Sequence, residues 1–248
     1  MTGIGHGRLL LVTGAAGVLG TAICRRIAAD GHRVLMMDID AEGLRTRAGL
    51  VGEPARPVVA DVGDLAAVER ACRSIRDAHG HVDTLVNNAG LLTGSGTEET
   101  SPDEWRRLMA VNLDGAFHLA RALLPGMRER GFGRVVNVCS MAMKTGGLTA
   151  GTAYVASKGG LGALTFALAR ETAAHGITVN AVAPAYVRTP MVTEQLTHDQ
   201  RQALLRRIPV GRFCEPEEVA ELVAFLVSTH AGFITGEVID INGGLHMD

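Results

Sequence analysis

The sequence predicts one α/β domain in which a doubly wound parallel sheet of about seven strands is covered by helices on both faces. Three observations support this fold class. Short apolar runs of strand length alternate with longer segments of helical spacing along the whole chain. A glycine-rich turn follows the first apolar run, and an acid ends the second. The 248 residues contain no internal repeat or linker, so we expect residues 1–248 to form a single domain.

The composition argues against several classes of partner. Apolar residues make up 47% of the chain and aromatic residues only 4%, so the core must be aliphatic and platforms for stacking bases are few. The net charge of −2 gives no sign of a nucleic-acid or membrane-surface partner. No apolar run approaches the ~20 residues of a membrane-spanning helix. We therefore expect a soluble protein that binds neither nucleic acid nor a membrane.

The cysteines and the N-terminus add two expectations. The four cysteines lie far apart and match no metal-ligand spacing: Cys24, Cys72, Cys139 and Cys214. Together with the lack of a signal peptide, this predicts no metal site and a reducing, cytoplasmic compartment. Residues 1–7 are rich in glycine but follow no strand, so we expect a flexible N-terminus rather than a nucleotide loop.

The first part of the chain has the pattern of a β-α-β unit. An apolar run at 8–12 leads into the glycine-rich turn TGAAGVLG at 13–20, and a helical pattern follows at 21–30. Gly31 ends that pattern as a helix C-cap would. The next apolar run ends in Asp38.

This unit points to a dinucleotide. Glycines let the backbone turn tightly and approach a pyrophosphate, which sits at the N-terminus of the helix. Asp38 follows Gly20 at about the expected interval, and a carboxylate there accepts hydrogen bonds from the adenosine ribose and repels a 2′-phosphate. No Arg or Lys lies between Thr13 and Gly20. The pattern therefore favours NAD over NADP, unless Asp38 is simply a solvated acid in a turn.

The alternation of strands and helices continues to the end of the chain. Further strands are expected at 56–60, 82–86, 134–139, 178–182 and 237–241, and further helices at 65–79, 101–123, 153–174 and 215–227. The helix at 101–123 has clear start signals, with Ser101 at the N-cap, Pro102 at the first helical position and Glu104 at the third. Residues 190–212 have only patches of helical spacing, and we expect them to form a lid over a substrate.

The segment after the strand at 134–139 carries a hydroxyl on Ser140, a phenol on Tyr154 and an ammonium on Lys158. Tyr154 and Lys158 are four residues apart, which on a helix puts them on one face, one turn apart. A cation beside a phenol lowers its pKa from about 10, which makes tyrosine useful as an acid or base near neutral pH. Because this spacing alone is a weak signal, an ordinary helix-surface pair is the alternative interpretation.

Seven motifs in one order strengthen the catalytic interpretation. They are the TG-x-x-x-x-x-G loop at 13–20, Asp61-Val62, N-N-A-G at 87–90, Asn112, Ser140, Tyr154-x-x-x-Lys158 and P-x-x-V-x-T at 184–189. In this order and approximate spacing they resemble the short-chain dehydrogenase/reductase family over essentially the whole chain. The resemblance implies a Rossmann-type fold and a nicotinamide-dependent oxidoreductase that acts on CH–OH groups.

The resemblance also implies roles for four residues. Tyr154 would be the general acid/base that exchanges a proton with the substrate oxygen, and Ser140 would hydrogen-bond the same oxygen. Lys158 would lower the pKa of the phenol and bind the nicotinamide ribose. Asn112 would connect Lys158 to a chain of waters that reaches solvent.

The implied cofactor contacts extend along the chain. They are Gly14, Gly17, Leu19, Gly20, Asp38, Asp61, Val62, Asn88, Ala89, Gly90, Tyr154, Lys158, Val187 and Thr189. One departure concerns the loop, where Val18 replaces the family's middle glycine. A β-branched residue tolerates positive φ poorly, so we expect a different loop shape over the pyrophosphate.

The substrate side has weaker signals. Candidate pocket residues are mostly apolar: Leu92, Met141, Leu148, Tyr186 and Met191. Tyr186 follows Pro184-Ala185, where the family has Pro-Gly, and could narrow the pocket. Lys144 could pair with an anionic substrate or be a solvated loop residue. Cys139 is expected to be a buried strand residue and not a nucleophile.

The leading hypothesis is an NAD-dependent oxidoreductase that transfers a hydride between nicotinamide and a secondary alcohol or ketone. An NADP-dependent ketone reductase, for example of 3-oxoacyl thioesters, is the alternative within enzymes. A non-catalytic dinucleotide-sensing protein is the alternative from another class, but it predicts the loss of Ser140, Tyr154 or Lys158, and all three are present. The resemblance further implies a homotetramer with 222 symmetry, or a dimer.

Overall fold

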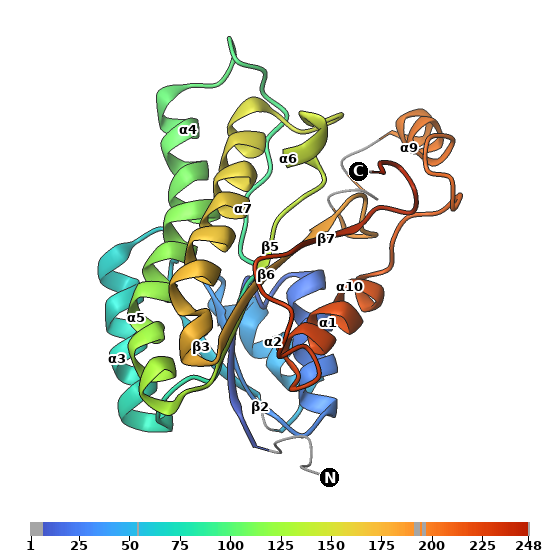
Figure 1. Ribbon diagram of the computed structural model, residues 1–248. Coiled ribbons are helices and arrows are strands. Elements are labelled where there is room, and N and C mark those ends of the chain that lie inside the picture. Colours follow the sequence, from blue (N-terminus) through green and yellow to red (C-terminus); the bar gives the residue numbers. More distant parts are fainter. Residues whose placement is uncertain (1–6, 54, 191–193, 195–196, 248) are drawn as a thin grey trace.

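The computed structural model describes residues 7–53, 55–190, 194 and 197–247. Its centre is a sheet of seven parallel strands in the order β3-β2-β1-β4-β5-β6-β7 (Figure 1). The strands are β1 (Leu9–Thr13), β2 (Arg33–Asp38), β3 (Ala55–Val59), β4 (Thr84–Asn87), β5 (Gly133–Val138), β6 (Ile177–Pro184) and β7 (Val238–Ile241). The predicted doubly wound parallel sheet of about seven strands is confirmed.

Helices cover both faces of this sheet (Figure 1). One face carries α1 (Val18–Ala29), α2 (Ala41–Val51) and α10 (Pro216–Val227). The other carries α3 (Leu65–His79), α5 (Gly115–Arg130) and α7 (Thr152–Thr172). The remaining helical segments are α4 (Pro102–Met109), the π-helical turn η1 (Ala110–Asp114), α6 (Ala142–Thr145), the 3-10 turn η2 (Ala173–His175) and α9 (His198–Leu205). None of the helices in the described part of the chain is both long and apolar enough to span a bilayer.

The two cores explain why the central strands are continuous apolar runs. Along β1, Leu9 and Leu11 pack into the core under α3 and α5, whereas Leu10 and Val12 pack into the core under α1 and α10. Successive side chains of a strand point to opposite faces, so a strand that is covered on both sides needs apolar residues at every position.

The helix starts follow the capping signals in the sequence. The Ser101 hydroxyl accepts a hydrogen bond from the Glu104 amide (3.1 Å), and Pro102 begins α4. Two of the predicted helices differ from the structure by more than two residues. Helix α1 begins at Val18 rather than at residue 21, because Gly17 serves as its N-cap. The predicted helix at 101–123 is α4, η1 and α5 in succession, since the backbone makes a π-turn around Asn112.

The strand order places a crevice at one edge of the sheet. The chain adds β2 and β3 on one side of β1 and then places β4 on the other side. At such a reversal, the loops after neighbouring strands diverge and leave room for a ligand at the carboxyl ends of the strands. The loops that follow β1, β4 and β5 meet there.

The expected lid lies near the C-terminal segment. Within 190–212 the structure describes α9, while residues 191–193 and 195–196, including the pocket candidate Met191, lie outside the described residues. The α9 region forms an apolar cluster with the end of the chain: Leu204, Leu205, Ile208, Phe213, Tyr186 and Leu245. The amide of Val210 donates to the carbonyl of Gly243 (3.1 Å), which ties the two segments together (Figure 1).

Candidate active site

Two adjoining cavities open at the carboxyl edge of the sheet. The larger, with a volume of about 670 Å³, follows the glycine-rich loop, the ends of β2 and β4, and residues 184–190. We call it the cofactor cleft. The smaller, of about 270 Å³, lies between the segments after β4, β5 and β6, and we call it the substrate pocket. Both cavities are lined by Leu92, Ser140, Tyr154 and Ala185, so these four residues mark the boundary between them.

The backbone of the glycine-rich loop lies close to that of the segment after β4 and to that of the first turn of α1. Gly14 has a positive φ of 64°, and a Cβ there would lie 2.8 Å from the Cα of Ala89. A Cβ on Gly20 would collide with the carbonyl oxygen of Gly14. In the described loop no side chain caps the N-terminus of α1 and its first turn holds no acid, so its amides face the cleft as an anion site requires.

The backbone strain expected at Val18 is absent. Val18 is the first residue of α1, and Gly17 before it has an ordinary φ of −71°. Across the described chain no non-glycine residue has a positive φ. The β-branched side chain is therefore unstrained, because the only left-handed position of the loop falls on Gly14.

Asp38 is held at the adenosine end of the cleft by two amides. Its Oδ2 accepts a hydrogen bond from the amide of Ala16 (3.0 Å), and its Oδ1 accepts one from the amide of Asp40 (3.1 Å). Asp40 and Arg47 also line the cleft near this point. Asp38 thus ties the glycine-rich loop to the end of β2, a second role that was not predicted.

The segment after β4 is anchored by a residue that the sequence analysis missed. The Thr13 hydroxyl accepts hydrogen bonds from the amides of Asn88 and Ala89, both at 3.0 Å. The Asn88 side chain donates to the carbonyl of Thr13 (2.9 Å). Asn88, Ala89 and Gly90 line the cleft as expected, but the Asn88 amide group is already engaged in holding the two loops together.

Asp61 and Val62 do not line the cleft. The Asp61 carboxylate accepts a hydrogen bond from the Gly63 amide (2.8 Å). Val62 is 7% exposed and packs in the core against Gly115. The structure places both residues in the turn after β3, next to Ala60, whose amide donates to the carbonyl of the cleft residue Asp38 (3.0 Å). Val187 and Thr189, in contrast, line the cleft as expected.

Asn112 lies in the π-helical turn and is 1% exposed. Its side chain accepts from the Leu91 amide (2.8 Å) and donates to the Leu91 carbonyl and to the Ser157 hydroxyl, both at 2.9 Å. A buried polar side chain that satisfies three partners fixes the segment after β4 against α7. Single-turn π-bulges within α-helices occur frequently at functional sites.

Lys158 is buried next to this network and is 4% exposed. Its Nζ donates to the Val138 carbonyl (2.7 Å) and lies 5.9 Å from the ring centroid of Tyr154. A Cβ on Gly90 would lie 3.3 Å from this Nζ, so glycine leaves the ammonium room at the cleft wall. Burial lowers the pKa of Lys158 because desolvation disfavours the ammonium.

The net shift in the pKa of Tyr154 is upward, and the lowering by Lys158 that the family resemblance implies stays a prediction for the enzyme with its cofactor bound. Burial of the phenol is the largest effect and raises the pKa of Tyr154 above its ordinary value, while a hydrogen bond with Ser140 acts in the opposite direction. The Ser140 hydroxyl also accepts from the Ala142 amide (3.1 Å), which fixes its position. The arrangement therefore favours a protonated phenol at the boundary of the two cavities.

The substrate pocket contains four of its five candidates. Leu92, Met141, Leu148 and Tyr186 line it. The structure adds residues that the sequence analysis did not select: Thr93, Gly94, Ala142, Thr145, Thr149, Ala150, Ala185 and Leu245. Leu245 reaches the pocket from the C-terminal segment, and only the fold could reveal that contact.

Lys144 does not line the pocket. Its Nζ lies 3.0 Å from Oδ2 of Asp240 on β7, and the two side chains are only 21% and 16% exposed. Neither interpretation of Lys144, as an anion receptor or as a solvated loop residue, is therefore correct. Burial raises the pKa of the Cys139 thiol to about 11, in agreement with a buried residue that is not a nucleophile.

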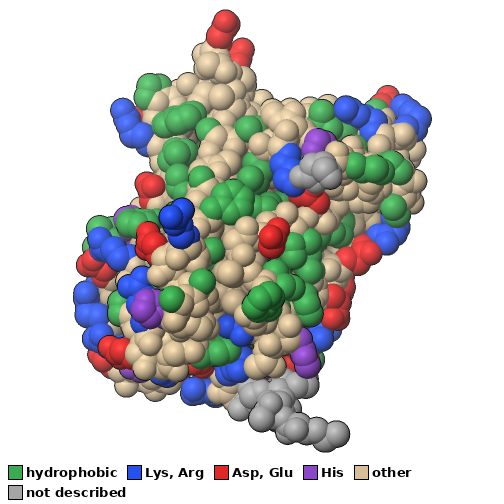
Figure 2. Space-filling view, in the orientation of Figure 1, with side chains coloured by type: hydrophobic (Ala, Val, Ile, Leu, Met, Phe, Trp, Pro, Cys, Tyr) green, Lys and Arg blue, Asp and Glu red, His purple; other side chains and the backbone are tan. Residues whose placement is uncertain are grey.

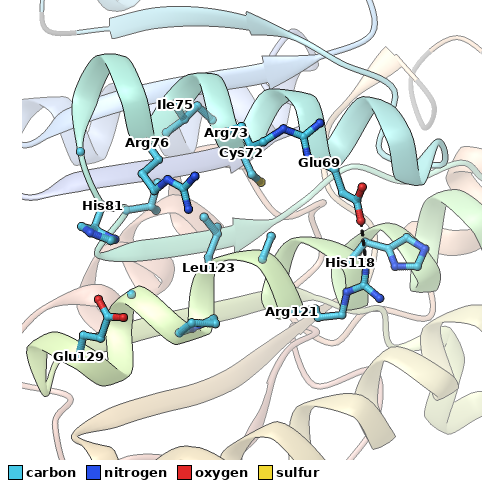
Figure 3. Close-up of a pocket in the computed structure, with 15 residues that line it drawn as sticks. Glu69, Cys72, Arg73, Ile75, Arg76, His81, His118, Arg121, Leu123 and Glu129 are labelled. Atoms are coloured by element: carbon cyan, nitrogen blue, oxygen red, sulfur yellow. Dashed lines mark hydrogen bonds and ion pairs between the residues drawn. The ribbon is translucent and has the colours of Figure 1, made fainter.

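A third cavity, of about 370 Å³, lies between α3 and α5 (Figure 3). Its rim carries Arg76, His81 and Glu129, and an ion pair of 3.0 Å joins Glu69 to Arg121. It adjoins Gly80 and Val82 at the amino end of β4, the opposite edge of the sheet, and shares no lining residue with the other two cavities. Ligands of open α/β sheets bind at the carboxyl edge, so we assign the site there. Within the described residues no cluster of His, Cys, Asp and Glu could hold a metal ion.

Known proteins resemble the chain over its full length. A family model described as enoyl-(acyl carrier protein) reductase matches residues 14–246. The 3-oxoacyl-(acyl-carrier-protein) reductase FabG of Haemophilus influenzae is 36% identical over 242 residues, which are 98% of this chain and 99% of that protein. FabG of Vibrio cholerae is 38% identical over 243 residues, which are 98% of each chain.

Two crystal structures are similar in fold. A protein of Beutenbergia cavernae, assigned as an NAD(P)-dependent gluconate 5-dehydrogenase and holding NADP at low occupancy, has a TM-score of 0.92 and 36% identity, with 98% of each chain covered. A Brucella melitensis protein described as a short-chain dehydrogenase/reductase of glucose/ribitol dehydrogenase type has a TM-score of 0.91 and 33% identity, with 99% of each chain covered.

Proposed function

The chain belongs to the short-chain dehydrogenase/reductase family, and we propose that it transfers a hydride between NAD and a secondary alcohol or ketone. It is an oxidoreductase of the kind that binds a nicotinamide cofactor. The observation that carries the proposal is the boundary between the two cavities. Ser140 and Tyr154 line both the cleft and the pocket, so a substrate oxygen that meets them lies beside the cofactor.

Each residue at this boundary has a proposed part in the reaction. Tyr154 donates a proton to the carbonyl oxygen during reduction and accepts it back during oxidation. Ser140 hydrogen-bonds the same oxygen and holds it beside the phenol. The cofactor, when bound, supplies the hydride chemistry. Lys158, on the cleft wall, binds the ribose next to the nicotinamide, and Asn112 fixes the segment that faces it.

The remaining cofactor contacts follow from the cleft. Gly14, Gly17, Leu19 and Gly20 surround the pyrophosphate at the start of α1, and Val187 and Thr189 meet the carboxamide. Asp61 and Val62 do not line the cleft, so their contact with the adenine requires a cofactor that extends past its described wall.

The choice of NAD rests on charge at the adenosine end. The charged residues that line the cleft there are Asp38, Asp40 and Arg47. They contribute two carboxylates and one guanidinium. A 2′-phosphate would add about two negative charges beside a carboxylate held in place by two amides. The ribose of NAD can instead donate hydroxyl hydrogen bonds to Asp38.

A second candidate is an NADP-dependent reductase of 3-oxoacyl thioesters. The full-length likeness to 3-oxoacyl-(acyl-carrier-protein) reductases supports it, as does the NADP held by the similar protein of Beutenbergia cavernae. The ratio of kcat/KM for NADH to that for NADPH, measured with a ketone and with an acetoacetyl thioester, separates the two. We expect NADH to be preferred with both. A clear preference for NADPH with the thioester would favour the second candidate.

The acid/base role of Tyr154 has a direct test. Tyr154→Phe removes only the hydroxyl, and we expect kcat to fall at least about 100-fold, because a positioned acid contributes that much or more. Fluorescence of bound NADH should show that cofactor binding survives. Turnover close to that of the unchanged protein would rule out this role.

Four expectations about organisation are retained as proposals. We propose one domain over 1–248, a lid formed by 190–212, a homotetramer built partly from α7 and β7, and a cytoplasmic location. Large exposed apolar side chains support association: Trp105 on α4, Phe117 on α5, Phe166 on α7, and Phe225 on α10. The four free cysteines fit a reducing compartment.

A further inference from the structure

The walls of the substrate pocket carry no charge. Beyond the boundary residues, the pocket is lined by apolar residues, by small residues and by four residues with uncharged hydroxyls, Thr93, Thr145, Thr149 and Tyr186. No Lys, Arg, His, Asp or Glu is among the described residues that line it. A carboxylate or phosphate that entered would lose its hydration without gaining an opposite charge, which is costly.

Three cations in neighbouring segments are already paired with other groups. Lys144, which follows the pocket residues Met141 and Ala142, is paired with Asp240 on β7. Lys158 donates to the carbonyl of Val138 and lines only the cofactor cleft. Arg188 lies 2.8 Å from Glu215. These cations cannot turn to a substrate anion without leaving a carboxylate or a buried carbonyl without its donor.

One buried hydroxyl in the pocket is unsatisfied. The Oγ1 atom of Thr93 is buried and has no hydrogen-bond partner within the described chain. Thr93 is fixed by its backbone, since its carbonyl accepts from the Gly151 amide (2.7 Å). Buried polar atoms usually have a partner, so this hydroxyl is suited to a polar group of the ligand.

We infer that the substrate is an uncharged carbonyl compound or secondary alcohol with an apolar body, and that Thr93 binds a second, uncharged polar group on it. This inference rests on the proposed function. It excludes gluconate, which is an anion and is the substrate in the name of one structural relative. The 3-oxoacyl group of a thioester fits, because both of its carbonyls are uncharged.

Acetoacetate and its ethyl ester test the charge, because they share the reacting ketone and differ by one negative charge. We expect kcat/KM with NADH to be at least about 100-fold higher for the ester, since the pocket offers the anion no counter-charge. Lys144→Met should leave this ratio unchanged. An equal or higher value for acetoacetate would overturn the inference and leave the proposed function intact.

A cation introduced into the pocket tests whether the lack of a counter-charge causes the preference for the ester over acetoacetate. Leu148 is 41% exposed, so an arginine there can keep its charge in contact with water. Leu148→Arg should narrow the ratio of ester to acetoacetate at least about tenfold, and Leu148→Gln, which is similar in length but uncharged, should not. If both variants kept the original ratio, charge in this pocket would not set the preference, and the inference would fail.

The proposed role of the Thr93 hydroxyl is tested by comparing a ketone that has a second polar group with one that lacks it. Thr93→Val keeps the shape and removes the hydroxyl, so we expect kcat/KM to fall about tenfold for ethyl acetoacetate and little for 2-pentanone, which lacks the second oxygen. Thr93→Ser should behave like the unchanged protein. Equal losses for both ketones in Thr93→Val would refute a role for Thr93 in recognition.

A measurement of ligand binding tests this inference separately from the proposed function, because it does not need turnover. If none of these ketones were reduced, the proposed function would fail. Quenching of NADH fluorescence in the enzyme–NADH complex would then still compare the two compounds. Tighter binding of ethyl acetoacetate supports an uncharged ligand, and tighter binding of acetoacetate contradicts it.

Discussion

Tyr154 shows how a side chain's surroundings outweigh its sequence spacing. The Y-x-x-x-K spacing places an ammonium near the phenol, yet burial raises the pKa of Tyr154 and Lys158 directs its Nζ to the Val138 carbonyl. Spacing identifies neighbours on one helix, but the desolvation of the phenol depends on segments outside that helix, such as the one that carries Cys139 and Ser140 after β5. The residues were therefore predictable and their protonation was not.

This protonation predicts opposite pH profiles for the two directions. Reduction needs the protonated phenol. The value of kcat/KM should therefore be at its maximum below the raised pKa of Tyr154 and fall as pH rises through that pKa. Oxidation needs the phenolate and should rise over the same range. Because the hydrogen bond with Ser140 lowers the pKa of Tyr154, Ser140→Ala should shift both profiles to higher pH. Initial rates measured from pH 6 to well above the ordinary phenol pKa of about 10 test this, and a profile that moves to lower pH would contradict the geometry.

Asp38 has two functions that one substitution can separate. Asp38→Asn removes the charge that repels a 2′-phosphate, so we expect the ratio of kcat/KM for NADPH to that for NADH to rise about tenfold. The asparagine has one acceptor oxygen for two amides, those of Ala16 and Asp40. The loss of a hydrogen bond of about 1 kcal/mol should lower Tm by roughly 2–4 °C.

Glu42→Gln is the control for this substitution, since Glu42 is an acid in the first turn of α2 that does not line the cleft. It should change neither the cofactor ratio nor Tm. A shift in the cofactor ratio of the same size as in Asp38→Asn would show that general charge, and not Asp38, sets the preference.

At the scale of elements, one ion pair joins α6 to the last strand. Lys144 and Asp240 are 96 positions apart in sequence and both largely buried. Lys144→Met leaves the carboxylate of Asp240 without its cation, so we expect a loss of about 1–3 kcal/mol in the free energy of unfolding. The double variant Lys144→Met/Asp240→Leu should recover most of it. Urea unfolding measures both, and an unchanged single variant would show that the pair contributes nothing.

The elements also show where sequence reasoning ends. Capping residues predicted the start of α4, and the order of motifs identified Asn112 despite its position within a predicted helix. The π-turn itself was not predictable, because it follows from hydrogen bonds between Asn112, Leu91 and Ser157. Leu245 was missed for the same reason, since it reaches the pocket through contacts between distant segments.

For the whole molecule, the surface suggests association. On the face shown in Figure 2, hydrophobic and uncharged atoms occupy the centre, and most charged side chains lie toward the edges. Phe166 on α7 is 51% exposed. Phe166 lies on α7, one of the two elements from which the proposed homotetramer is built.

Phe166→Glu should therefore lower the molar mass measured by light scattering after gel filtration. Leu50→Glu makes the same change on α2, where Leu50 is 61% exposed, and should leave the assembly intact. If Phe166→Glu kept the mass of the unchanged protein, α7 would not contribute to the assembly.

The groove between α3 and α5 offers a place to engineer a more robust biocatalyst. It lies at the opposite edge of the sheet from the reacting groups. The buried side chains of Cys72 and Leu123 line its floor (Figure 3), and the exposed Ala122 is also among its lining residues. Ala122→Leu would cover that floor, and we expect it to raise Tm by about 2–4 °C while kcat/KM stays unchanged. Resistance to heat and choice of substrate could then be optimised separately, one at each edge of the same sheet.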